Sequence, residues 1–184
     1  DLNDTGRWQA ERLARALTDD RLDAVYSSDL LRALDTASTL AASTGLTVRT
    51  DAALRERSFG VFEGLTFAQI EQRYPAESLS WRQRDADFGP EGGEALSMFY
   101  QRAVSGVAAI AARHRGQHVA VVTHGGVLDA LYRAAARVAL DAPRTWQIGN
   151  ASINRLLHGD HGFTLVGWGD CLHPERPPID EVGA

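Results

Sequence analysis

The segment 119–126, VAVVTHGG, restricts the fold of this chain more than any other. Its four leading apolar residues, bounded by polar ones, predict a short buried strand. His124 follows that strand, and Gly125 and Gly126 allow the backbone to turn tightly and approach a ligand closely. The apolar pattern of 127–138 predicts a helix, whose free N–H groups would face an anion near His124. Taken alone, a histidine at a strand end is equally consistent with a structural role.

Further strands and helices alternate along the chain. We expect helices at about 5–17, 29–43, 66–73 and 94–113, and strands at 24–26, 47–50, 152–157 and 163–168. Thr5 is available to cap the first helix, and Gly45 ends the second helix. Tyr74 and Pro75 end the third helix. The last two strands form a hairpin around 159–162. From His173 onwards we expect irregular structure. This order predicts a three-layer α/β/α sandwich with a mostly parallel central sheet.

The composition predicts one globular domain over residues 1–184, with 44% apolar and 23% charged residues. The chain contains no apolar stretch long enough to cross a membrane and begins with polar residues, unlike a signal peptide. A net charge of −5 without a basic run argues against nucleic acid as the main partner. The single cysteine, Cys171, cannot form an internal disulfide, which fits the cytoplasm.

All nineteen basic residues are arginines. The absence of lysine excludes a P-loop lysine, a kinase lysine and a Schiff-base lysine within these residues. Any phosphate would therefore be bound by arginine, whose planar guanidinium donates to two oxygens at once. Genome composition alone also accounts for such a bias.

The second candidate segment is 27–37, SSDLLRALDTA, where a strand leads into a helix that Ser28 or Asp29 can cap. Arg32 lies one turn into that helix, near the end of the sheet, where it can hold a phosphate. The alternative is an ion pair with Asp29 or Asp35 on a solvated face.

The third candidate segment is 54–64, LRERSFGVFEG. Glu56 lies there between Arg55 and Arg57 and is a candidate general acid; Glu63 is less favoured. The alternative for both carboxylates is a surface salt bridge. Arg55 and Arg57, with Arg82 and Arg84, would favour acidic phosphate esters unless they are simply solvated.

Together these segments resemble the histidine phosphatase superfamily, in its phosphoglycerate mutase-like branch. Five motifs stand in the order and at the spacing that the family has: TGRWQAERLA (5–14), SSDLLRALDTA (27–37), LRERSFGVFEG (54–64), GPEGGEA (89–95) and VVTHGG (121–126). Each motif is weak alone, whereas five in sequence are specific.

The resemblance implies roles for individual residues. Arg32 matches the arginine that binds the transferred phosphoryl group, Glu56 the proton donor and His124 the second active-site histidine. Gly125 would offer a backbone N–H to the phosphate. Ser58 and Phe59 would line the substrate side, and Glu94 would help to organise the pocket. The implied substrate is a small phosphorylated metabolite, without metal or cofactor, and the implied protein is a monomer or homodimer. His158 and His161 lack the nearby ligands that a metal pair would need.

One part of the family pattern does not occur in this sequence. The family's nucleophile is the histidine of an arginine, histidine, glycine triplet at the end of the first strand, ahead of the TGRWQA helix. We expect about 25 to 30 residues before Asp1 that carry this strand and histidine. The resemblance implies a phosphatase acting through phosphohistidine, with a phosphoglycerate mutase as the alternative, or a non-catalytic phosphate-binding protein if no upstream histidine exists. The stretch between Gly64 and Gly93 is short for the closing segment of a glycolytic mutase, which favours the phosphatase.

Overall fold

The computed structural model describes residues 1–173. Its helices are α1 (Asp4–Ala16), α2 (Leu31–Thr44), α3 (Phe67–Arg73), α4 (Pro75–Arg82), α5 (Leu96–Arg113) and α6 (Gly125–Ala136), with 3-10 turns η1 (Ala52–Leu54) and η2 (Gly60–Phe62). Its strands are β1 (Ala24–Ser27), β2 (Val48–Thr50), β3 (Val119–Val122), β4 (Ile153–Gly159) and β5 (Gly162–Asp170). The alternation expected from the sequence is confirmed.

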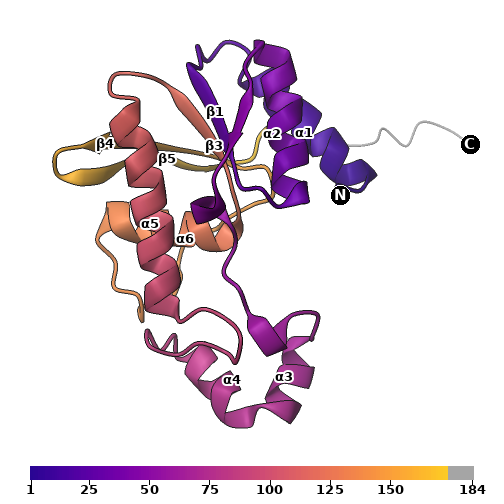
Figure 1. The fold of residues 1–184 in the computed structure, drawn as a ribbon, viewed down its shortest axis with the longest axis vertical. Helices are drawn as coiled ribbons and strands as arrows, with labels where there is room; N and C mark the ends of the chain where they lie inside the picture. The colour runs from indigo at the N-terminus through magenta and orange to yellow at the C-terminus, as the bar shows by residue number, and fades with distance from the viewer. Residues whose placement is uncertain (174–184) are drawn as a thin grey trace, which may run out of the picture.

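The central sheet is parallel, in the order β2-β1-β3, and β4 and β5 form a separate antiparallel hairpin (Figure 1). Successive side chains of a strand face opposite sides of the sheet. Val25 of β1 accordingly packs in a core with α1 and α2, while its neighbours Ala24 and Tyr26 pack in a second core with α5 and α6. Helices therefore cover both faces of a parallel sheet, as the predicted three-layer architecture requires.

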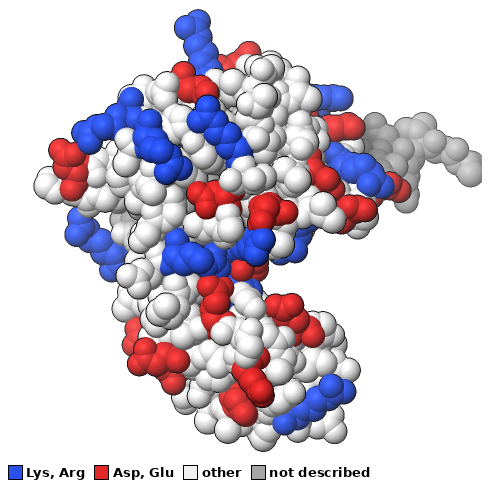
Figure 2. All heavy atoms as spheres, in the orientation of Figure 1, with Lys and Arg blue, Asp and Glu red and all other residues white. Residues whose placement is uncertain are grey.

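A lobe formed by α3 and α4 projects away from the sheet, at the bottom of Figure 1. Its core is aromatic, with Phe62 packed against Tyr74, Trp81 and Phe88 at ring-centroid distances of 5.4 to 6.2 Å. Figure 2 shows that the molecule is hollowed between this lobe and the body that holds the sheet. Basic and acidic side chains are interspersed on that face, which therefore carries no extended basic patch.

The prediction that Tyr74 and Pro75 end the third helix is confirmed, since α3 ends at Arg73 with Tyr74 as its C-cap. The next helix, α4, was not predicted; Pro75 occupies its first position, where the missing N–H and fixed φ are favourable. Two local predictions were wrong. The cap of α1 is Asn3, whose side chain accepts from the Gly6 N–H, and not Thr5, which lies inside the helix. Neither Ser28 nor Asp29 occupies the cap position of α2, because that position falls on Leu30, whose backbone is extended at φ −70° and ψ 131°.

The remaining boundaries agree closely with expectation. Gly45 ends α2 in the left-handed conformation, at φ 71°, and the terminal hairpin turns between Gly159 and Gly162. Apart from His173 itself, the tail predicted to be irregular lies outside the described residues. Within residues 1–173, no helix has the length and apolarity needed to span a bilayer.

Candidate active site

Three predicted site residues lie beyond the carboxyl ends of neighbouring parallel strands. His124 follows β3, Arg32 lies in the first turn of α2 after β1, and Glu56 follows η1. All three line one cavity of about 1590 Å³. Ligands of open α/β sheets bind outside the carboxyl ends of the strands, and this edge is therefore the candidate site.

His124 is buried, with 6% of its surface exposed, and lies directly before α6. Its Nε2 atom is buried and has no hydrogen-bond partner among the described residues. Burial, and then the positive charge of Arg32, hold the pKa of His124 below its ordinary value of 6.5, while the Glu56 carboxylate opposes part of this shift. At neutral pH the ring is therefore an uncharged group with a nitrogen available to a ligand.

Glu56 is held by backbone groups and not by a surface ion pair. Its Oε1 accepts from the Arg57 N–H at 2.9 Å, and its Oε2 accepts from the Gly126 N–H at 3.0 Å. A β-carbon at Gly126 would collide with the Glu56 carboxylate, so any other residue there would require this carboxylate to move. The first turn of α6 thus fixes the position of this carboxyl group beside His124.

Arg32 forms neither of the ion pairs considered from the sequence. Asp29 instead accepts from Arg55 through both carboxylate oxygens, at 2.6 and 2.5 Å. Asp35 accepts from the backbone N–H of Leu2 at 3.2 Å. Within residues 1–173 the Arg32 guanidinium has no carboxylate partner, so its planar set of donors is available at the cavity wall.

The model of the histidine phosphatase superfamily, branch 1, matches residues 1–171. The chain belongs to this superfamily. It is 40% identical to phosphoglycerate mutase-like protein 4 of Arabidopsis thaliana, over all of this chain and 80% of the relative. It is 37% identical to glucosyl-3-phosphoglycerate phosphatase of Mycobacterium tuberculosis, over 85% of this chain and 74% of the relative. A solved structure of the mycobacterial glucosyl-3-phosphoglycerate phosphatase with VO3 is similar, with a TM-score of 0.80 and 36% identity over 92% of this chain and 87% of that one.

The other predicted residues of this histidine phosphatase lie in two places. Gly125 lines the same cavity as His124, at the first position of α6. Ser58 and Phe59 do not line it: the Ser58 N–H donates to Glu94, and Phe59 packs against Trp81 at 5.6 Å between ring centroids. Their roles toward substrate stay predictions.

Four arginines considered for acidic esters all have partners inside the histidine phosphatase itself. They are Arg55 with Asp29, Arg82 with Glu71, Arg84 with Asp129, and Arg57 with the carbonyls of Phe88 and Glu94. Arg57 is also buried, with 7% of its surface exposed. These contacts account for the four side chains without a ligand, so Arg32 is the better candidate for a phosphate.

Sequence reasoning missed Arg102 of α5. Its guanidinium reaches the backbone of the segment that carries Glu56 and the carboxylate of Glu94. The sequence offered only a weak signal, an arginine two helical turns after Glu94. The contact with the Glu56 segment joins residues more than forty positions apart, which no local pattern reveals.

Proposed function

We propose that this protein hydrolyses small phosphate monoesters in two phosphoryl transfers, through a phosphohistidine whose histidine precedes Asp1. The observation that carries the proposal is the convergence of Arg32, Glu56 and His124 on one cavity at the carboxyl edge of the sheet. These residues supply a bidentate cation, a proton carrier and an imidazole N–H donor, the groups that phosphoryl transfer uses. The mycobacterial relative named a phosphatase supports the same reaction.

In the first transfer, the upstream histidine attacks phosphorus in line with the ester oxygen. The new N–P bond forms as the P–O bond breaks, and Glu56 gives its proton to the leaving alkoxide. Arg32 binds the equatorial oxygens through its planar donors, and His124 donates to one of them through Nε2, which has no protein partner in the described chain. Negative charge on the phosphoryl oxygens would favour the protonated form of His124.

In the second transfer, water attacks the phosphohistidine. Glu56, now a carboxylate, takes a proton from the water as the new P–O bond forms and the P–N bond breaks. The histidine departs with the electron pair of that bond, and inorganic phosphate is released. Glu56 ends the cycle protonated, as it began, and its fixed position against Gly126 serves both steps.

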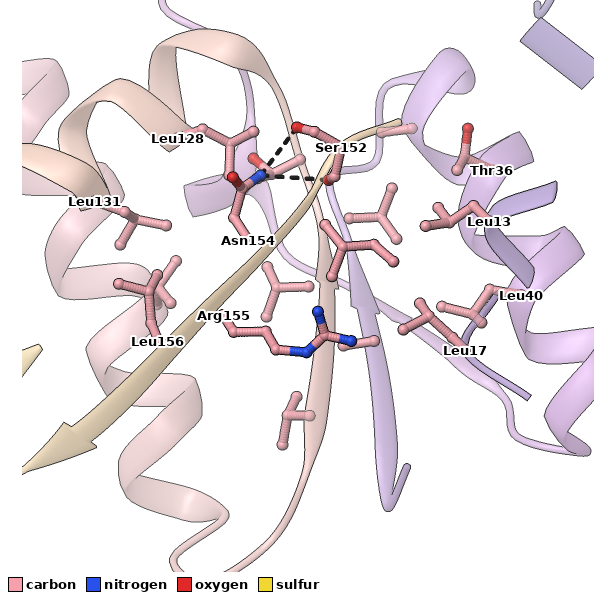
Figure 3. A pocket seen from close by; sticks show the side chains of 18 of the residues that line it. Leu13, Leu17, Thr36, Leu40, Leu128, Leu131, Ser152, Asn154, Arg155 and Leu156 are labelled. Atoms are coloured by element: carbon pink, nitrogen blue, oxygen red, sulfur yellow. Dashed lines mark hydrogen bonds between the residues drawn. The ribbon is translucent and has the colours of Figure 1, made fainter. Parts of the chain in front are cut away.

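The shape of the cavity supports a strand as the carrier of the nucleophile. Among the described residues β3 is an edge strand, and the cavity runs along it to β4 (Figure 3). All four residues of β3 are only half-buried, whereas all four of β1 are buried. Native sheets seldom leave an apolar edge uncovered. The edge of β3 therefore favours a further strand beside it.

The walls of the cavity have the chemistry that such a strand needs. Apolar side chains line one wall from α1 and α2 and the other from α5 and α6: Leu13, Leu17 and Leu40, and Val107, Ile110 and Leu131. A strand between these walls presents apolar residues to both faces, as a central strand of a parallel sheet does. If it runs parallel to β3, its carboxyl end reaches Arg32 and His124. The residue that follows such a strand is then well situated to attack a bound phosphate.

The test is turnover of a panel of phosphate esters by the full-length protein, in EDTA, with and without 3-phosphoglycerate. We expect phosphate release that EDTA does not reduce, a loss of about 100-fold in His124→Ala, because one transition-state donor is removed, and no loss in the control His161→Ala. His161 is exposed in the hairpin turn. An unaffected His124→Ala variant or activity abolished by EDTA would contradict the mechanism. Isomerisation of 3-phosphoglycerate without phosphate release would identify a mutase, and phosphate binding without turnover a binding protein.

A further inference from the structure

Arg102 uses all of its hydrogen-bonding capacity in a single place. A guanidinium carries five N–H donors. Arg102 donates two hydrogen bonds to the Glu94 carboxylate, at 2.8 and 2.7 Å. It donates three more to the carbonyl oxygens of Ala53, Arg55 and Glu56, at 2.9, 3.0 and 3.4 Å. A lysine has three donors and no planar geometry, so it cannot make these five hydrogen bonds.

These acceptors surround the candidate general acid. The three carbonyls belong to the segment that leads into Glu56 and to Glu56 itself, and Glu94 also accepts from the Ser58 N–H at 3.1 Å. The backbone is therefore held on both sides of Glu56. The Glu56 carboxylate is held separately, by the Gly126 N–H. Two sets of contacts thus define the position of its carboxyl group relative to α6.

The Arg102–Glu94 pair is stronger than an ordinary surface ion pair. Each side chain is 26% exposed, and the two hydrogen bonds are parallel and charge-assisted. The hydrogen bonds from Arg102 are the largest cause that holds the pKa of Glu94 below its ordinary value of 4.5. The guanidinium also lies over the ring of Phe99, 5.2 Å from its centroid. The pair is therefore a rigid support under the Glu56 segment.

We propose that Arg102 is a positioning residue for proton transfer by Glu56, acting with Glu94. The proposal rests on the proposed phosphatase mechanism. Loss of the five hydrogen bonds lets the segment shift, and a displacement of about 1 Å in a catalytic group is enough to lower a rate about 100-fold. Arg102 itself does not line the cavity, so its removal leaves phosphate binding by Arg32 intact.

Substrates with different leaving groups separate this role from a merely structural one. An alkyl phosphate needs a proton from Glu56 as its P–O bond breaks, whereas p-nitrophenolate is stable enough to depart without one. In the full-length protein, kcat/KM reports the steps up to that cleavage. For Arg102→Met we expect kcat/KM to fall about 100-fold with 3-phosphoglycerate and less than about 5-fold with p-nitrophenyl phosphate. Glu56→Gln is expected to show the same asymmetry, at least as large.

The control is Arg7→Met in α1, because Arg7 is 60% exposed, does not line the cavity and pairs with Asp4 within its own helix, at 2.8 Å. It is expected to match wild type on both substrates. If Arg102→Met does not fold, Arg102→Lys serves, and a smaller asymmetry in the same direction is expected. Equal losses on both substrates, or no loss, in a folded variant would refute the role of Arg102 alone. A wild-type protein inactive on both substrates would refute the proposed phosphatase as well.

Discussion

Replacing Gly126 with alanine is expected to lower the activity of this site while leaving the stability of the protein nearly unchanged. Gly126 lies in the first turn of α6, and alanine there gains up to about 1 kcal/mol of helix propensity. The added methyl group, however, meets the Glu56 carboxylate and the ring of Phe99. The carboxylate then has to move away from the Gly126 N–H, which donates to it at 3.0 Å.

The magnitude follows from that hydrogen bond. A hydrogen bond to a charged group contributes about 1.5 to 3 kcal/mol, which corresponds to a loss of about 10- to 150-fold in kcat/KM if it is absent in the transition state. We expect this loss with 3-phosphoglycerate as substrate, while the free energy of unfolding changes by less than about 1 kcal/mol because the gain in propensity offsets part of the strain.

The assay is steady-state turnover of the full-length protein together with urea unfolding. Gly125→Ala is the reference for stability alone, since a β-carbon there meets nothing within 4 Å. If Gly126→Ala stays folded and keeps kcat/KM within about 3-fold of wild type, the reasoning about how Glu56 is held is wrong.

Three further predictions follow from the site and its support. Arg32→Lys is expected to lower kcat/KM about 10-fold or more without changing the urea midpoint, because the guanidinium has no carboxylate partner to lose; an unchanged kcat/KM would count against its phosphate role. Asp129→Ala is expected to cost about 3 to 5 kcal/mol in urea unfolding, because it strips the counter-ion from the fully buried Arg133 and from Arg84; a cost below about 1 kcal/mol would contradict this. The pKa of His124 is lower folded than unfolded, so its contribution to stability is present above pH 6.5 and is lost as the pH falls from 6.5 toward the folded pKa. Urea midpoints measured from pH 7.5 to 5 should therefore decline less in His124→Asn than in wild type, and parallel declines would refute this assignment.

The sequence predicted those parts of the molecule that local patterns determine. The apolar run of β3 and the glycines after His124 predicted a strand, a turn and a helix, and the structure has all three. Tyr74 and Pro75 end α3 as predicted, but α4 was not expected, because a proline is compatible both with the end of one helix and with the start of the next. The cap of α1 is Asn3 and not the predicted Thr5, which has the same capping chemistry and lies less than one turn away.

The candidate site also contains features that the sequence predicted and features that it did not. The resemblance carried by the order of the five motifs implied that Arg32, Glu56 and His124 share one site, and the three residues line one cavity. Charge patterns near Arg55 and Arg84 did not reveal their partners, Asp29 and Asp129, because those pairs form across the fold. Contacts of this kind form only when distant segments of the chain pack together. A local sequence pattern therefore does not predict them.

The support given to Glu56 by Arg102 belongs to the same class of long-range contact. Its guanidinium joins α5 to the segment before Glu56 across more than forty residues. The three carbonyl acceptors are main-chain atoms, which every residue type supplies. For that reason the amino-acid letters of this segment give no sign of the contact.

The most direct test of the central claim is to trap the enzyme intermediate and map it. The full-length protein is quenched with base during turnover of a ³²P-labelled ester, digested, and the labelled peptide sequenced. The account predicts an acid-labile, base-stable phosphohistidine in a peptide that precedes Asp1, at reduced level in Arg32→Lys. Label on His124, or turnover without any phosphohistidine, would contradict it.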